Sequence, residues 1–142
     1  MALNEVFRPD KHRSMPVPAG TKSGDPIRVG LINGVAVTDR ANTGVAPFNT
    51  DGSPNSTYNA GGGNPDGHAS VWTWGGHRLN VVASAKPEFG SGVYFDPEGA
   101  AGKKLTATAG SLALYGAVAD AAPTDNGDGT WSCIVDIASP TK

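Results

Sequence analysis

Apolar and polar residues alternate in short runs along this chain, and no segment shows the spacing of a helix of normal length. The clearest run lies near the C-terminus, where every second residue of segment 131–137 is apolar: Trp131, Cys133, Val135 and Ile137. Several shorter runs of the same kind are separated by turn signals. The pattern predicts an all-β fold, a small antiparallel β-barrel or sandwich of about eight strands.

Turn residues between these runs predict two hairpins. Asn33-Gly34 is a pair favoured at positive φ in a two-residue turn, so we expect it to join strand 27–32 to strand 35–37. Segment 105–118 repeats the arrangement, with two apolar runs on either side of a glycine. We therefore expect this segment to form a second hairpin.

Composition divides the chain into three parts. Residues 1–22 mix charge with proline, which favours an extended N-terminal arm. Residues 23–142 carry the strand signals and are expected to form one β-domain. Within them, residues 41–70 hold 6 Gly, 5 Asn and 3 Pro among 30 positions, which predicts a long loop insertion. Such loops are either functional or disordered, and the Gly61-Gly62-Gly63 run favours mobility.

Overall composition limits the function classes. Leu, Ile, Val and Phe supply 26 of 142 residues, so the core is expected to be thin. A net charge of −2 does not favour nucleic-acid binding, which needs an excess of Lys and Arg. No apolar run approaches the roughly 18 residues that span a bilayer, so no membrane association is expected. The single cysteine, Cys133, excludes an internal disulfide and fits synthesis in a cytoplasm.

No segment completes a catalytic or metal-binding motif. Gly99–Lys104 lacks the spacing and the hydroxyl residue of a phosphate-binding loop. The acidic turn 125–129 has glycine where a calcium loop needs oxygen ligands, and a tight hairpin explains it better. The three histidines lack zinc-site spacing. We therefore expect no enzymatic activity, no cofactor and no metal.

Four glycine-punctuated strand signals carry a resemblance to a known family. In chain order they are Ser23–Gly30, Gly34–Val37, Gly92–Asp96 and Tyr115–Val118. Taken in this order and spacing, the chain resembles the phage capsid decoration (cement) proteins of the DUF2190 family. The match spans roughly residues 22–137, except at 41–70, where the family has a short connection.

The resemblance implies a structural role on a bacteriophage virion. A member of this family would bind the outer surface of the assembled head at capsomer junctions and stabilise the shell. Its partners would be the major capsid protein and further copies of itself, with a homotrimer expected first and a dimer second. We expect residues 1–22 to strap onto the capsid by adding a strand, through Val6, Phe7, Arg8, Lys11 and Arg13.

Four aromatic residues outside the arm are candidates for oligomer or surface contacts: Phe48, Tyr58, Trp72 and Trp74. Strand periodicity places Trp72 and Trp74 on one face, where they serve either as core or as an intersubunit contact. An aromatic pair of this kind also offers a stacking surface to sugars. The alternative function is therefore a carbohydrate-binding surface module that uses exposed tryptophans.

Overall fold

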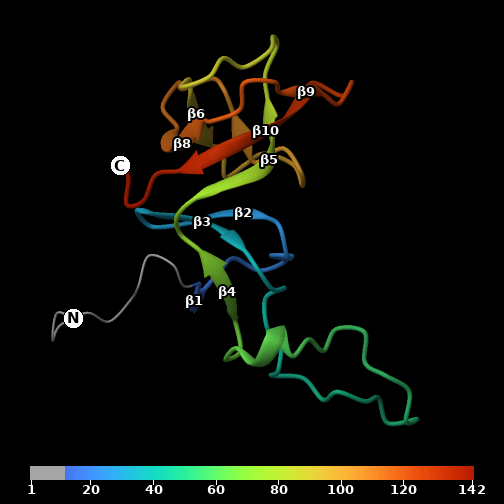
Figure 1. Cartoon of the computed structure of the whole chain (residues 1–142). Helices are drawn as coiled ribbons and strands as arrows, with labels where there is room; N and C mark the ends of the chain where they lie inside the picture. The colour runs from blue at the N-terminus through green and yellow to red at the C-terminus, as the bar shows by residue number, and fades with distance from the viewer. Residues whose placement is uncertain (1–11) are drawn as a thin grey trace, which may run out of the picture. The chain divides into compact units, whose positions relative to one another are not determined.

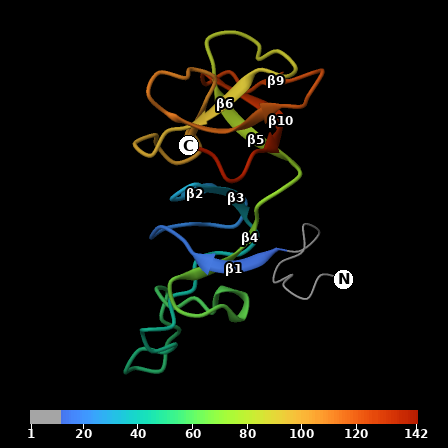
Figure 2. The ribbon, with the colours of Figure 1, turned by 90° about the vertical axis from the view of Figure 1, so that its left-hand side faces the viewer.

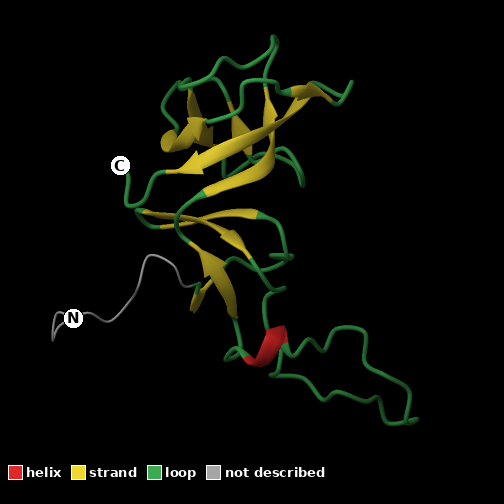
Figure 3. Cartoon of the chain, viewed as in Figure 1, coloured by secondary structure: helices red, strands yellow, loops and turns green. Residues whose placement is uncertain are grey.

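The protein is built from β-strands, as the sequence predicts. The computed structural model describes residues 12–142, and in these residues the regular elements are ten strands and one short 3-10 turn (Figure 3). They are β1 (Arg13–Pro16), β2 (Pro26–Val29), β3 (Ile32–Ala36), η1 (Gly61–Gly63), β4 (His68–Trp72), β5 (Gly76–Val82), β6 (Gly92–Phe95), β7 (Leu105–Thr106), β8 (Ala113–Val118), β9 (Thr124–Asp125) and β10 (Thr130–Ile137). The strands form one four-stranded and one six-stranded sheet.

The chain divides into two units, described separately below. Unit 1 contains described residues 12–29 and 35–72, and unit 2 contains residues 30–34 and 73–142. The boundaries differ from the expected division at residue 22. Arg13–Pro16 forms β1, which pairs with β4, so this part of the expected arm belongs to a sheet.

Unit 1 is built on an open sheet in the order β1-β4-β3-β2 (Figure 2). β1 and β4 run antiparallel, with Met15 opposite Ala69, and β3 pairs with β4 through Val35 and Ala36. The buried apolar residues of the unit are Met15, Val17, Ile27, Val35, Ala36, Ala41, Ala69 and Val71. Three of these are alanines, so unit 1 has the thin core that the composition predicts.

The first hairpin turns earlier than expected. β2 ends at Val29 and β3 begins at Ile32, so the turn falls on Gly30 and Leu31, and Gly30 adopts the positive φ of 59°. The prediction of an Asn33-Gly34 turn is wrong, because Asn33 is fully buried within β3. Its side chain forms hydrogen bonds with residues distant in the sequence, and it does not form part of a turn.

The Asn33 amide is a hydrogen-bond centre in unit 2. Its nitrogen lies 2.8 Å from the Thr141 hydroxyl and 3.2 Å from the Leu114 carbonyl, and it also contacts the Ala138 carbonyl. Two N–H groups can serve two of these acceptors at a time. The Ser139 hydroxyl accepts from the Asn33 backbone N–H at 3.1 Å, so one residue ties β3 to the C-terminal segment.

Unit 2 contains a closed barrel. β10 pairs with β5 along most of its length and with β8 near its end. β8 pairs with β6, β6 with β7, and β7 with β5, which is the one parallel pair of this circuit. Because the pairings return to β5, these strands enclose a small barrel, and β9 pairs with the first part of β10, at Trp131 and Ser132. The expected barrel is therefore confirmed for this unit.

The barrel strands supply the larger core of the protein. The buried apolar residues of unit 2 are Leu79, Val81, Val93, Leu105, Tyr115, Val118, Cys133, Val135 and Ile137. This confirms the inward row predicted for segment 131–137, except that Trp131 is half-buried. The hairpin predicted for 105–118 is wrong, because β7 and β8 do not pair with each other. β7 lies between β5 and β6, and β8 lies between β6 and β10.

Candidate functional site

The most distinctive exposed feature of unit 1 is an irregular hairpin, residues 42–59, here called the 42–59 loop. Figure 1 shows it extending away from β4 and η1. At its base Asn42 and Asn59 exchange two backbone hydrogen bonds of 2.8 and 3.1 Å. Near its tip Phe48 and Pro54 form a second antiparallel bridge. Part of the expected 41–70 insertion thus has a defined backbone path, and η1 and the start of β4 occupy the rest.

The tip of the 42–59 loop is a tight turn held by short polar side chains. The Ser53 carbonyl accepts from the Asn49 N–H at 2.8 Å, and the Asn49 carbonyl accepts from the Gly52 N–H at 3.0 Å. The Asp51 carboxylate accepts from both the hydroxyl and the N–H of Ser53, at 2.5 and 2.9 Å. These bonds from Ser53 hold the pKa of Asp51 below its ordinary value of 3.8.

Asn55 organises the middle of the 42–59 loop. Its side-chain N–H donates to the Ala46 carbonyl at 2.8 Å, which crosses the loop. Its side-chain oxygen accepts from the Thr57 N–H and hydroxyl, at 3.0 and 2.8 Å. Its backbone N–H donates to the Pro47 carbonyl at 2.9 Å. One asparagine therefore connects both sides of the loop.

Asp39 and Asn59 fix the base of the loop within unit 1. The Asp39 carboxylate accepts from the Ser23 N–H at 2.9 Å, from Lys22 Nζ at 3.3 Å and from the Asn59 amide at 3.2 Å. The bond from Ser23 and the neighbouring Lys22 lower the pKa of Asp39. The Asn59 oxygen in turn accepts from the Gly61 N–H at 2.8 Å.

Gly61 packs closely against Ala41, which immediately precedes the loop. It is buried, has a φ of 56°, and a Cβ at this position would lie 2.4 Å from the Ala41 Cβ. A side chain would therefore clash in a conformation that already favours glycine. The structure gives the first glycine of the Gly61–Gly63 run a packing role, in place of the mobility that the sequence favours.

The outer surface of the 42–59 loop is apolar and amide-rich, with little charge. Phe48 is 62% exposed and Val45 is 37% exposed, whereas Tyr58 is half-buried. Asp51 is the one charged residue between positions 42 and 59. The loop can therefore offer aromatic contact area and amide hydrogen bonds to a partner, but almost no electrostatic attraction.

The structure distributes the other predicted contact residues over both units. Trp72 ends β4 half-buried, with its ring edge-on to His12 at a centroid distance of 5.4 Å. Trp74 belongs to unit 2 and is 43% exposed. Arg13 lies half-buried in β1. The other predicted arm residues, Val6, Phe7, Arg8 and Lys11, lie outside the described residues.

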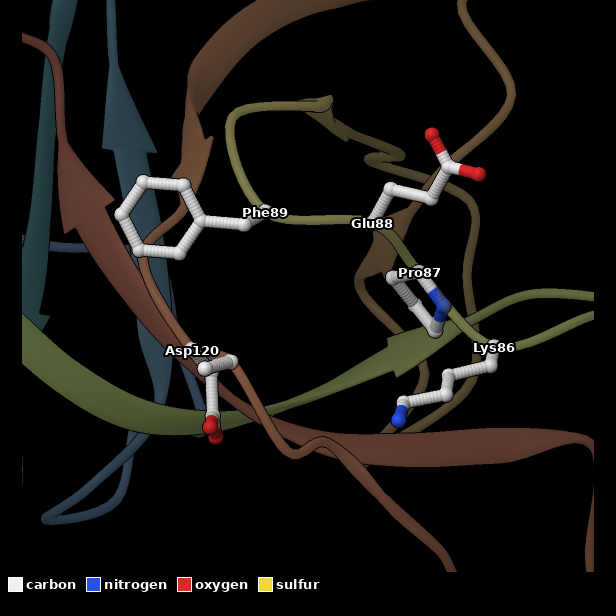
Figure 4. Close-up of a pocket in the computed structure, with 6 residues that line it drawn as sticks. Lys86, Pro87, Glu88, Phe89 and Asp120 are labelled. Atoms are coloured by element: carbon white, nitrogen blue, oxygen red, sulfur yellow. The ribbon is translucent and has the colours of Figure 1, made fainter.

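Unit 2 carries a pocket of about 370 Å³ (Figure 4). Its lining residues are Lys86, Pro87, Glu88, Phe89, Asp120 and Ala121. The buried Asp120 carboxylate already accepts from the N–H groups of Ala122 and Ile134, at 2.9 and 3.2 Å, and from Arg78 at 3.3 Å. The bonds from Ala122 and Ile134 and the nearby Arg78 lower the pKa of Asp120. This carboxylate therefore has a structural role, with little accepting capacity left for a ligand.

The exposed Phe89 in this pocket was missed by sequence reasoning. It is 70% exposed, beside the charged residues Lys86 and Glu88. Its position in Pro87–Gly90, a segment bounded by a proline and a glycine, is the sequence signal that could have identified it.

Within residues 12–142, no three His, Cys, Asp or Glu side chains gather as a metal site would require. Burial raises the pKa of the Cys133 thiol, which disfavours the nucleophilic thiolate. In the same residues no helix has the length and apolarity to cross a membrane.

Comparison of the chain with protein-family models, with curated proteins and with solved structures finds no match.

Proposed function

We propose that this protein is a structural decoration protein of a bacteriophage head, bound to the outer surface of the assembled shell at capsomer junctions. The observation that carries the proposal is the 42–59 loop, an exposed element with its own hydrogen bonds and a 62% exposed phenylalanine. Such a loop is suited to contact with another protein. The resemblance of four strand signals to the cement-protein family supports the same function.

The stabilising effect follows from linkage. A protein that binds the assembled lattice more tightly than free subunits lowers the free energy of the lattice, and opening the shell then costs more. The chain would bind the major capsid protein and would assemble as a homotrimer, with a dimer as the second choice. The arm residues Val6, Phe7, Arg8, Lys11 and Arg13 are proposed as further capsid contacts.

Co-sedimentation tests the proposal. Purified protein is mixed with empty heads of the phage that encodes it, and in parallel with unassembled capsid subunits of the same phage. We expect saturable binding to heads and little binding to free subunits. Equal binding to both, or no binding to heads at micromolar concentration, would contradict the proposal.

Carbohydrate binding is the second candidate, and one observation favours it. Trp74 is 43% exposed, and tryptophan side chains at a surface can stack on sugars. A glycan array tests this function, with Trp74→Ala as the variant. Glycan binding that disappears in the variant would favour this candidate over the capsid.

A further inference from the structure

The 42–59 loop has the physical features of a preformed binding loop. Its ends are joined at Asn42 and Asn59, its tip at Phe48 and Pro54, and its middle through Asn55. Every residue from 43 to 54 is exposed, so these bonds are not by-products of core packing. Ordering a loop before it binds reduces the entropy that binding must overcome.

Phe48 is the residue of this loop best placed to act as an anchor. A large, stiff aromatic side chain adds contact area at low conformational cost, while neighbouring Asn, Ser and Thr residues supply adaptable hydrogen bonds. Phe48 follows Pro47 and pairs across the loop with Pro54, so the residue before it and the residue opposite it both have a restricted φ. This differs from a single exposed hydrophobic residue on a mobile segment.

The charge of the loop decides the kind of partner. Asp51 is the only charged residue between positions 42 and 59, and its Oδ1 already accepts two bonds from Ser53. The loop carries no Lys or Arg, so it cannot neutralise phosphates. The complementary surface is therefore an uncharged, apolar pocket on a protein.

We infer that Phe48 inserts into an uncharged apolar pocket on the outer face of the assembled head, and that the 42–59 loop is the principal docking element. The inference rests on the proposed function, because the head is its partner. It also separates two modes of attachment. Binding through the loop is insensitive to salt, whereas binding through Arg8, Lys11 and Arg13 weakens as salt screens their charges.

The structure offers a matched control for Phe48. Phe89 is the same residue type, is 70% exposed, and lies in unit 2 beside charged residues. Phe48→Ala and Phe89→Ala each remove one exposed ring and leave the buried core intact. Asn55→Ala is a third variant, which keeps Phe48 but removes the side-chain bonds to Ala46 and Thr57.

The experiment measures the Kd for empty heads by co-sedimentation, at low and at high salt. For Phe48→Ala we expect the Kd to rise about 30-fold, the size of an interface hot spot. For Phe89→Ala we expect a change of less than about twofold, since exposed residues outside an interface contribute little. Asn55→Ala should lie between them, because it loosens the loop without removing the ring. The wild-type Kd should change less than about threefold with salt.

The outcomes separate the inference of docking through Phe48 from the proposed decoration function on which it rests. If the wild type binds heads and Phe48→Ala binds equally well, the docking inference is overturned while the decoration function stands. A wild-type affinity that falls steeply with salt and depends on the arm cations overturns it in the same way. If the wild type binds no heads, the proposed function fails and the inference falls with it. Equal thermal unfolding midpoints show that the variants are folded, and Phe48→Leu, which keeps an apolar group, should restore part of the affinity.

Discussion

Unit 2 closes its sheet, whereas unit 1 leaves its sheet open. The pairings of unit 2 return from β10 to β5, so the barrel strands have partners on both sides. In unit 1 the order β1-β4-β3-β2 leaves β1 and β2 as edge strands. β1 has four residues and ends in proline, two features by which proteins limit further strand pairing. The β1 edge of unit 1 is therefore poorly suited to long strand pairing with another chain.

The two units also differ in what holds them together. The buried apolar residues of unit 2 include one tyrosine and two leucines, whereas three of the eight in unit 1 are alanines and none is aromatic. Unit 1 relies more on asparagine and aspartate bonds, such as those among Asp39, Asn59 and Gly61. A typical hydrogen bond contributes about 1 kcal/mol net, less than the burial of a large side chain. We therefore expect most of the stability to come from unit 2, while the proposed docking loop belongs to unit 1.

Removing Tyr115 should have the largest effect on stability. Its side chain is fully buried in unit 2, stacks on Phe95 at 6.2 Å, and donates to the Gly34 carbonyl at 2.6 Å. We expect Tyr115→Ala to lower the free energy of unfolding by about 4 kcal/mol, because it leaves a cavity and an unsatisfied carbonyl. Urea unfolding followed by circular dichroism measures the change.

Tyr115→Phe is the matched control for that variant. It keeps the ring and removes only the hydroxyl that bonds Gly34, so we expect a loss of about 1–2 kcal/mol. A Tyr115→Ala variant that loses no more than Tyr115→Phe would show that burial in unit 2 contributes little. The comparison between the units would then lose its basis.

Gly61→Ala should have a smaller effect that stays local to unit 1. The added Cβ would meet Ala41 at 2.4 Å, with φ at 56°. We expect a loss of about 2–3 kcal/mol, the cost of a strained backbone and a clash. Hydrogen exchange of the backbone amides of Asn42 and Asn59 measures the effect, and both amides should exchange faster.

Gly63→Ala separates the clash from the backbone conformation. Gly63 has a φ of 86°, but a Cβ there meets nothing within 4 Å. Only the conformational penalty of about 1–2 kcal/mol then applies. Equal exchange rates in Gly61→Ala and Gly63→Ala would contradict the packing role of Gly61 at the base of the loop.

The sequence was sufficient for the fold class but not for the pairing. Period-two alternation identified the inward row of β10, because one face of that strand is buried along most of its length. It failed at Asn33-Gly34, where the local turn preference was overridden by distant acceptors near Leu114 and Thr141. The sequence around Asn33 does not indicate its contacts with the C-terminal segment.

The candidate site was predictable in part. Composition located the 41–70 insertion and singled out Phe48 as a candidate contact residue, since few large apolar side chains occur there. The structure shows that Phe48 is exposed, and its contact role stays a prediction. The order within the loop was not predictable, because it depends on bonds such as that from Asn55 to Ala46, nine residues apart. The nearby Asp51–Ser53 pair is different. It follows the local pattern in which an aspartate accepts from a residue two positions later, which the sequence alone permits.

The smallest predicted effect is a change at the loop tip in acid. Asp51 accepts from the N–H and hydroxyl of Ser53, at 2.9 and 2.5 Å, and Asp128 in unit 2 accepts from Thr130 in the same way, at 3.0 and 2.5 Å. These bonds lower the pKa of both carboxylates from 3.8. Because the folded pKa lies below the unfolded one, each carboxylate stabilises its turn fully above pH 3.8, and the effect is lost as the pH falls through the folded pKa.

The amide NMR shifts of Ser53 and Thr130 should therefore stay constant between about pH 7 and 5 and move only in stronger acid. Asp51→Asn keeps an oxygen acceptor but removes the titration, so the Ser53 shift should become independent of pH while the Thr130 shift still moves. Ser53 is exposed and Thr130 is buried. The two amides therefore report the titration of the same aspartate turn, once on the surface of unit 1 and once within unit 2. If the Ser53 amide were already shifting near pH 6, the loop tip would lack the Asp51 bonds, and a preformed docking element could not depend on them.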